Sequence, residues 1–261
     1  MSGLSILPYR AASLAVLCLG LTLGASAANA NPATSHASSQ LFPGQTAPLK
    51  LSQAFKPPNR GEAPPSAGGA TRGQTCLRDI TKFKSLIPGK QPGLTLSTHP
   101  TFHWYLPEGP ATKANFLILG NQDQDVVYET TVDLPAKAGI VSFTLPKAAP
   151  ALALNQQYHW YLVVQCSRKN QSANPSVEGW IERVQLESGL MQQIATADIA
   201  TQAALLANNG IWYDALVASA QFRAQQGNSQ QAKTAWAELL GSVGLGELVQ
   251  APVLSARLSQ E

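Results

Sequence analysis

The chain has 261 residues, 44% of them hydrophobic and 13% charged, with 18 Lys and Arg against 15 Asp and Glu. The basic residues form no run or stripe and are not interleaved with the aromatic residues, which argues against a nucleic-acid partner. The apolar content is enough for one core and a smaller second unit.

The first thirty residues carry the three parts of a secretory signal peptide. Arg10 is their only charge, an apolar run spans 11–23, and small residues precede a cleavage site after Ala30. The run is shorter than a membrane span of about 20 residues, so a retained anchor is the second interpretation. A lipid anchor on Cys18 is disfavoured, because lipid-attachment signals need a small residue directly before the cysteine and this chain has Leu17 there. We therefore predict an exported chain, periplasmic or extracellular, without stable membrane insertion after cleavage.

Residues 31–75 are rich in Pro, Ala, Ser and Gly. Such a composition buries too little apolar surface to offset the entropy lost on ordering, so we predict a disordered leader that acts as a tether. Two Pro-Pro pairs leave open a docking peptide in an extended helix.

Two cysteines remain after removal of the signal peptide, Cys76 and Cys166. Thiols outside the cytoplasm are normally oxidised, so we predict a disulfide between them. A reactive thiol or a pair of metal ligands is the alternative, but neither has supporting neighbours in the sequence.

Short runs of β-branched and aromatic residues, separated by Pro, Gly and Asn, begin near Leu94. Seven strands at this spacing, with no helical pattern between them, predict an antiparallel β-sandwich of the immunoglobulin or fibronectin type III kind over residues 76–187. The expected strands are 94–97, 101–106, 114–119, 126–133, 140–145, 157–165 and 177–186.

The tripeptide His-Trp-Tyr occurs twice, in FHWYLP and in YHWYLV. The period-two alternation of a strand sends Trp104 and Trp160 toward the core and His103 and His159 outward into solvent. In such a sandwich the two strands lie in opposite sheets, about 10 Å apart, so the histidines cannot share a metal ion. If the strands were neighbours in one sheet, the imidazoles could meet. We expect neither a metal site nor a cofactor.

The turn between two of these strands resembles a calcium loop only in part. Asn121, Asp123 and Asp125 alternate as calcium ligands do, but the glycine and the distal glutamate of such a loop are missing. We therefore interpret this segment as a solvated turn.

The sequence also lacks the common catalytic motifs. The sequence contains no nucleophile elbow, zinc-protease motif, phosphate loop or dinucleotide fingerprint. The best acid–base candidates are Glu178, Glu182 and Arg183, which flank Trp180 in VEGWIERVQL. A structural ion pair is the commoner reason for charges at such positions, so we predict that the protein is not an enzyme.

The C-terminal part, residues 188–261, changes from a period of two to about 3.6, which predicts a small helical segment. Helical turns are expected up to residue 208, followed by helices at 211–225 and 229–243.

A repeat signal runs through these helices. Gly210 and Gly244 are 34 residues apart, the period of tetratricopeptide repeats, and Ala215 fits the small contact position of that motif. Ser219 and Phe222 depart from it, so an ordinary helical hairpin stays open. With fewer than three units the helices should pack on the sandwich.

Six blocks follow one another along the chain: HPTFHWYLP, NFLILGNQDQDVVYETTVDLP, GIVSFTLP, QQYHWYLVVQC, VEGWIERVQL and NNGIWYDAL. In this order they resemble the domain of unknown function 928 (DUF928), a family typical of cyanobacteria, between residues 76 and 250. Both mature cysteines match positions associated with that family, whereas His159 stands where the family often has Arg. The resemblance implies this organisation and no activity.

We expect an exported, non-enzymatic binding or scaffolding protein that recognises another envelope protein or a polymer, by analogy with other proteins of these two architectures. Trp212 and Tyr213 are candidates for a contact surface at the junction of helices and sandwich, and Tyr105 and Tyr161 are outward aromatic candidates.

The alternative is a carbohydrate-active or hydrolytic module that uses Glu178, Glu182 and the outward tyrosines. A concave pocket with two neighbouring carboxylates would favour the enzyme. A flat apolar patch across the helix–sandwich junction would favour recognition.

Overall fold

The computed structural model describes residues 52–64, 76–120, 122–166, 174–227 and 229–259. All of them belong to one unit that spans residues 48–261. The predicted signal peptide, and the parts 31–51 and 65–75 of the predicted leader, lie outside the described residues. None of the described helices is long and apolar enough to cross a membrane.

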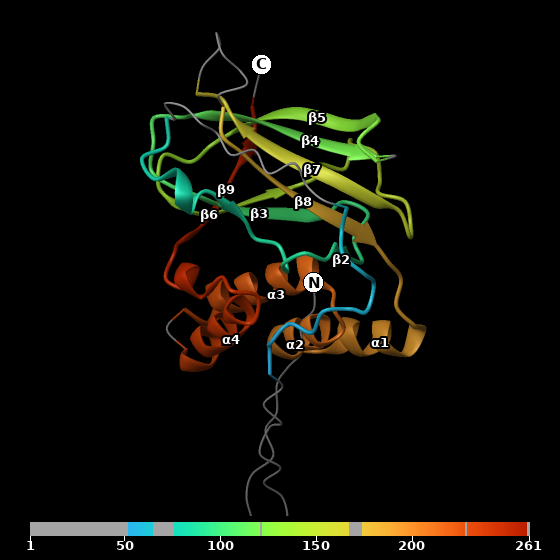
Figure 1. Ribbon diagram of the computed structural model, residues 1–261. Coiled ribbons are helices and arrows are strands. Elements are labelled where there is room, and N and C mark those ends of the chain that lie inside the picture. The colour runs from blue at the N-terminus through green and yellow to red at the C-terminus, as the bar shows by residue number, and fades with distance from the viewer. Residues whose placement is uncertain (1–51, 65–75, 121, 167–173, 228, 260–261) are drawn as a thin grey trace, which may run out of the picture. The chain divides into compact units, whose positions relative to one another are not determined.

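Within the described residues, ten strands form two facing sheets (Figure 1). The four-stranded sheet has the order β1 (Lys84–Ser85), β3 (Thr101–Leu106), β6 (Gly139–Thr144) and β9 (Val253–Ser255). The six-stranded sheet has the order β10 (Arg257–Leu258), β5 (Asp125–Asp133), β4 (Lys113–Gly120), β7 (Gln157–Val164), β8 (Ser176–Arg183) and β2 (Gly93–Thr95). Neighbouring strands are antiparallel except β6 with β9 and β2 with β8, so the prediction of a wholly antiparallel sandwich is wrong at these two parallel pairs.

The seven predicted strands are all present, with ends that differ by up to three residues. The strands β1, β9 and β10 were not predicted, because two or three residues are too few to show an alternating pattern.

Aromatic side chains from both sheets fill the core. Trp104 in β3 and Trp160 in β7 are both fully buried and come from different sheets, which confirms the predicted inward direction of the two indoles. The ring that meets Trp160 from the facing sheet is Phe102, with centroids 5.4 Å apart. Phe116 lies 4.8 Å from Phe102 and completes the centre of the core.

Four helices lie between β8 and β9 in the chain and form a layer beyond the four-stranded sheet (Figure 1). They are α1 (Ser188–Thr196), α2 (Ile199–Asn208), α3 (Trp212–Gln226) and α4 (Gln230–Gly241), followed by a 3-10 turn, η3 (Gly246–Leu248). The predicted turns up to residue 208 are two helices, because the Asp198 side chain accepts from Ala200 N and Thr201 N and starts α2 afresh. Of the four, α3 packs against β2 and β3.

The stretch Ser52–Arg60, which we call the strap, crosses the helices in an extended form. Gln53 is 3% exposed and donates from Nε2 to Ala200 O at 3.2 Å. The Phe55 ring meets Trp212 edge-on at 5.1 Å. The prediction of a disordered leader is therefore wrong for residues 52–64. A few buried anchors order a segment whose average composition is that of a tether.

The predicted cysteine pair is present at disulfide distance, with the Cα atoms of Cys76 and Cys166 5.3 Å apart. Cys166 follows the end of β7, so the bridge ties the start of the sandwich segment to the six-stranded sheet.

Candidate functional site

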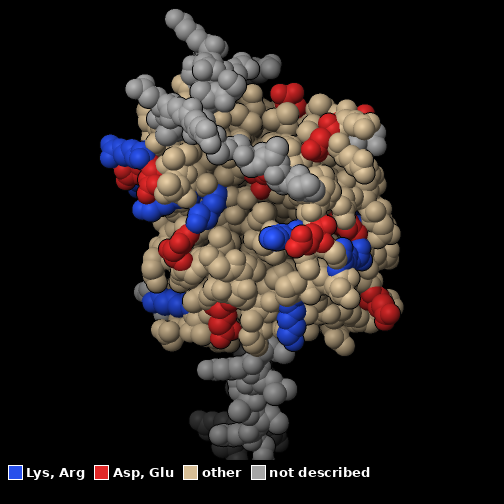
Figure 2. Space-filling model, viewed as in Figure 1, with Lys and Arg blue, Asp and Glu red and all other residues tan. Residues whose placement is uncertain are grey.

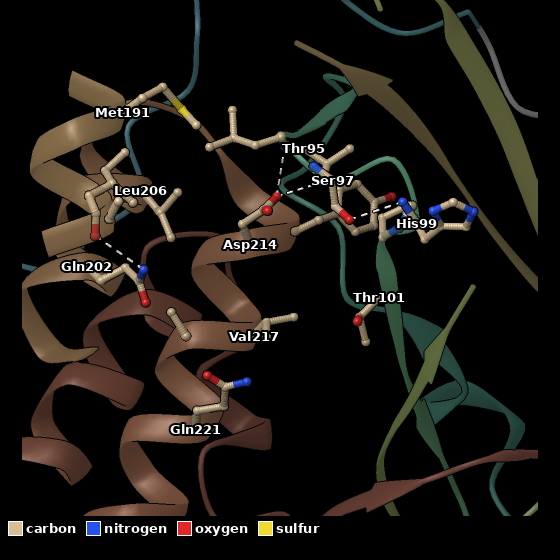
Figure 3. Close-up of a pocket in the computed structure, with 16 residues that line it drawn as sticks. Thr95, Ser97, His99, Thr101, Met191, Gln202, Leu206, Asp214, Val217 and Gln221 are labelled. Atoms are coloured by element: carbon tan, nitrogen blue, oxygen red, sulfur yellow. Dashed lines mark hydrogen bonds between the residues drawn. The ribbon is translucent and has the colours of Figure 1, made fainter. Parts of the chain in front are cut away.

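A pocket of about 380 Å³ lies where the helices meet the sandwich (Figure 3). One wall is the connection from β2 to β3, and the others are faces of α1, α2 and α3. We call it the junction pocket. Its lining includes Leu96, Ser97, His99, Thr101, Met191, Ile194, Gln202, Leu206, Asp214, Val217 and Gln221.

The first turn of α3 fixes one side of this pocket by inserting two aromatic side chains into the sandwich. Trp212 Nε1 donates to Leu86 O at 2.9 Å. Tyr213 Oη accepts from Trp160 Nε1 at 2.7 Å and donates to Trp180 O at 3.2 Å. These indole and phenol groups all form hydrogen bonds in the interior. A shift of α3 relative to the sandwich would therefore break buried hydrogen bonds.

A glycine in β2 makes room for this insertion. A Cβ atom at Gly93 would lie 2.5 Å from Cε2 of Tyr213, closer than real Cβ contacts. A side chain at this position would push the phenol out of the sandwich.

Asp214 forms the polar part of the pocket wall. Its Oδ2 accepts from Thr95 Oγ1 at 2.7 Å and from Leu96 N at 3.1 Å, and so ties the β2–β3 connection to α3 (Figure 3). Burial raises the pKa of this carboxyl above its ordinary value, against the opposing effect of the two hydrogen bonds. The shift favours the neutral acid, which can donate as well as accept.

The rest of the lining is mainly apolar. Leu96, Ile194, Leu206 and Val217 face the pocket, and Met191, 38% exposed, lies on the α1 side. Asp214 is the one acidic side chain among the described residues that line it. The pocket can therefore hold an apolar group and offer it a hydrogen bond, but it does not present the two carboxylates that paired acid–base chemistry needs.

A second polar cluster lies on the outer face of the six-stranded sheet, around His159. His159 Nδ1 lies 2.9 Å from Asp123 Oδ2 and 2.8 Å from Tyr161 Oη, and Nε2 lies 3.7 Å from Glu178 Oε2. The imidazole stacks on Trp180 at 4.2 Å. Burial and the carboxylates of Asp123 and Glu178 raise the pKa of Tyr161.

His159 is 1% exposed, so the prediction that it faces solvent is wrong. Its side chain points to the outer face as expected, but Trp180 and the turn that carries Asp123 cover it. Asp123 has a φ of 68°, a left-handed conformation that Asp adopts more readily than most residues. The turn interpreted as solvated therefore carries a side chain that is bonded to the sheet.

His103 is 2% exposed, and the prediction of solvent exposure is wrong here too. Thr101 and Tyr105 point to the same face of β3 as His103, and their surroundings show what covers that face. Thr101 lines the junction pocket beside α3, and Tyr105 lines a hollow shared with Leu248 of η3. The outer face of the four-stranded sheet is thus an interior surface under the helices. Burial lowers the pKa of His103 to about 4.

The acid–base candidates on β8 have separate partners. Glu182 is 5% exposed, pairs with Arg60 of the strap and accepts from Gln157 Nε2 at 3.2 Å. Arg183 donates to Leu152 O at 3.0 Å. Glu178 and Glu182 are four residues apart along one strand, about 13 Å. Among the described residues, no group of three or more His, Cys, Asp or Glu side chains is arranged to hold a metal ion.

On the face drawn in Figure 2, acidic and basic side chains lie among each other. Exposed ion pairs also join Arg78 to Glu108, at 3.1 Å, and Lys84 to Glu247. Charge of one sign does not gather on the described part of this face.

Residues 67–253 match the family model described as Domain of Unknown Function (DUF928). The chain belongs to this family. No curated protein matches the chain. The match covers β1 to β8 and the four helices, so the junction pocket lies inside the DUF928 region.

The aromatic candidates of the DUF928 region do not form one surface. Trp212 and Tyr213 lie at the helix–sandwich junction as expected, but they are 0% and 1% exposed, so neither ring is available to a partner. Tyr105 and Tyr161 are partly buried and lie in different sheets. The candidates Trp212 and Tyr213 are therefore part of the core, whereas Tyr105 and Tyr161 lie in opposite sheets, as the sandwich order leads one to expect.

Sequence reasoning missed Asp214 and the junction pocket. A signal was present, because an acidic residue directly follows two aromatic residues in the first turn of a helix. A carboxylate so close to buried rings needs donors from another segment. The pattern could not say which segment supplies them.

Proposed function

We propose that this DUF928 chain is an exported, non-enzymatic binding protein of the cell envelope that takes an apolar side chain of a partner protein into the junction pocket. The observation that carries the proposal is the pocket itself: about 380 Å³, with mainly apolar walls and one carboxyl whose pKa is raised by burial.

The size of the pocket supports an anchoring role. Ligand sites usually have volumes of about 300–1,000 Å³, and this pocket is at the small end of that range. It suits one or two side chains or a small aliphatic group. In protein interfaces a few apolar anchors in well-packed pockets supply most of the binding energy. Asp214 and the exposed Gln221 would fix the orientation of the anchor by hydrogen bonds.

Export is part of the proposal. The paired Cys76 and Cys166 support it, because disulfides persist outside the reducing cytoplasm. The signal-like pattern of residues 1–30 supports it independently.

The enzymatic alternative has less support from geometry. Glycosidases place their two carboxyl groups about 5–9.5 Å apart, whereas Glu178 and Glu182 are separated by about 13 Å of strand. A sugar-binding platform would need coplanar exposed rings, but Tyr105 and Tyr161 belong to different sheets.

We also propose that the sandwich is related to fibronectin type III domains and the helices to tetratricopeptide repeats. The neighbours β3–β6 in one sheet and β5–β4–β7–β8 in the other support a sandwich of the fibronectin type III kind. Gly210, with a φ of 75° at the turn from α2 to α3, and the fully buried Ala215 support a degenerate tetratricopeptide-like hairpin.

Affinity capture with a blocked pocket tests the proposal. Val217→Trp would place an indole in the pocket from the partly exposed side of α3, and Gln231→Trp on exposed α4 surface is the matched control. Residues 31–261 of each form would be used to capture proteins from native envelope extract. We expect a partner that is retained by the natural protein and by Gln231→Trp but lost with Val217→Trp. Equal retention by all three forms would contradict a role for the pocket.

A further inference from the structure

The strand β5 has an outer edge that is only partly covered. Arg257 and Leu258 of β10 pair with Asp133 and Val132, and Ser259 N donates to Thr131 O at 3.0 Å. Among the described residues, no strand pairs with the outer edge of residues 125–130. Figure 1 shows β5 at the margin of its sheet. The uncovered stretch is six residues, about 20 Å long.

The backbone direction of this edge follows from the bond made by Ser259. Since Thr131 O points toward β10, the alternation of the strand directs the N–H and C=O of Glu129 the same way. These groups continue the line that β10 begins. The pairing of β5 with β4 shifts register beside Val127, so this line of groups is regular at Glu129 and Thr131 and is interrupted by a β-bulge before Val126. An added strand could therefore form ladder hydrogen bonds at Glu129 without any change in the pairing of β5 with β4.

The side chains of the edge are acidic around an apolar contact. Asp125 and Glu129 are exposed, and Val126, at 62%, is the most exposed large hydrophobic side chain among the described residues. The nearest basic group of β4, Lys113, lies 3.8 Å from Asp133 at the far end of the strand. Lys113 is thus paired away from Asp125 and Glu129, whose carboxyl side chains would face an incoming strand.

We propose that residues 125–130 bind an extended basic segment of another protein as an added antiparallel strand. Main-chain bonds to Glu129 would supply the pairing, and lysine or arginine side chains opposite Asp125 and Glu129 would select the partner by charge. This edge is separate from the junction pocket, so the inference does not depend on the proposed function.

Charge makes a second copy of the chain a poorer occupant. Two-fold pairing of β5 with itself about Glu129 would place the two Glu129 side chains directly opposite each other, and pairing about Tyr128 would place them diagonally. Like charges in cross-strand pairs destabilise a ladder. The same acids protect the edge from self-association.

The probe is a fluorescein-labelled ten-residue peptide, KTKVKVKTKT, titrated into residues 31–261 and followed by fluorescence anisotropy. An otherwise identical peptide with Glu in place of Lys is the charge control. We expect saturable binding of the basic peptide only, with backbone amides of residues 127–130 protected from hydrogen exchange on binding.

Two edge variants separate backbone pairing from charge. Glu129→Pro removes the outward N–H and should weaken binding at least about tenfold. Glu129→Gln keeps the N–H and should weaken it about threefold. Glu187→Gln, on an exposed turn before α1, should bind as the natural protein does.

Three results would overturn the inference. The first is equal binding by Glu129→Pro and the natural protein, and the second is protection that appears away from β5. The third is a natural-protein dimer, seen by sedimentation, that Glu129→Pro dissolves, because the occupant of the edge would then be a second copy.

Discussion

Replacing His103 with Gln should flatten the acid side of the stability–pH profile. His103 is buried, and its pKa falls from 6.5 to about 4 on folding. Because the folded state resists protonation, the stabilisation is complete above about pH 6.5 and is lost as the pH falls through 4. This difference in pKa corresponds to about 3 kcal/mol of unfolding free energy lost between pH 7 and pH 4.

The assay is urea unfolding, followed by tryptophan fluorescence, at pH 7, 6, 5 and 4. Other carboxyl groups titrate in the same range, so the measured quantity is the difference in slope between His103→Gln and the natural protein. Tyr105→Phe, on the same strand, is the control, because it can change stability without removing a group that titrates in this range. Parallel profiles for His103→Gln and the natural protein would refute the argument that a neutral imidazole is held under the helices.

Three further substitutions test the junction by urea unfolding. Tyr213→Phe leaves Trp160 N–H without an acceptor and should cost about 2–3 kcal/mol; a loss below about 0.5 would contradict the buried bond. Asp214→Asn keeps an acceptor oxygen but cannot ionise. Burial raises the pKa of the Asp214 carboxyl in the folded state, so the natural protein should lose stability relative to Asp214→Asn as the pH rises above about 3.9. A difference in unfolding free energy between the two proteins that does not change with pH would refute the raised pKa. Phe55→Ala should cost about 3–5 kcal/mol and speed proteolysis of the strap, and unaltered cleavage would contradict its packing on Trp212.

The core of the sandwich could be predicted because strand alternation is a local property. The repeated His-Trp-Tyr places Trp104 and Trp160 on the inner faces of different sheets, and both are fully buried. The cysteine pairing followed from having only two candidates once Cys18 is assigned to the predicted signal peptide. Each of these inferences needs only a short stretch of sequence and one general rule.

The surroundings of the outer faces could not be predicted in the same way. Parity gives the side of a sheet on which His103 or His159 lies, but not what covers that side. Thr101 and Tyr105, on either side of His103, face α3 and η3, which lie more than a hundred residues downstream. A turn held by Asp123 covers His159. The junction pocket likewise needs Asp214 to meet Leu96 across more than a hundred residues.

The strap shows a different limit of sequence reasoning. The average composition of residues 31–75, to which the strap belongs, is that of a disordered tether. Order in residues 52–60 depends on Gln53 and Phe55, whose partners lie on α2 and α3. Two anchors cannot be recognised in a segment average.

The central claim is that the junction pocket accepts an apolar group, and a fluorescence titration with the neutral fluorophore N-phenylnaphthylamine tests it most directly. The natural protein and Gln231→Trp should give a saturable rise in emission, and Val217→Trp, folded by near-ultraviolet circular dichroism, should give none. Undiminished binding by folded Val217→Trp would contradict the claim.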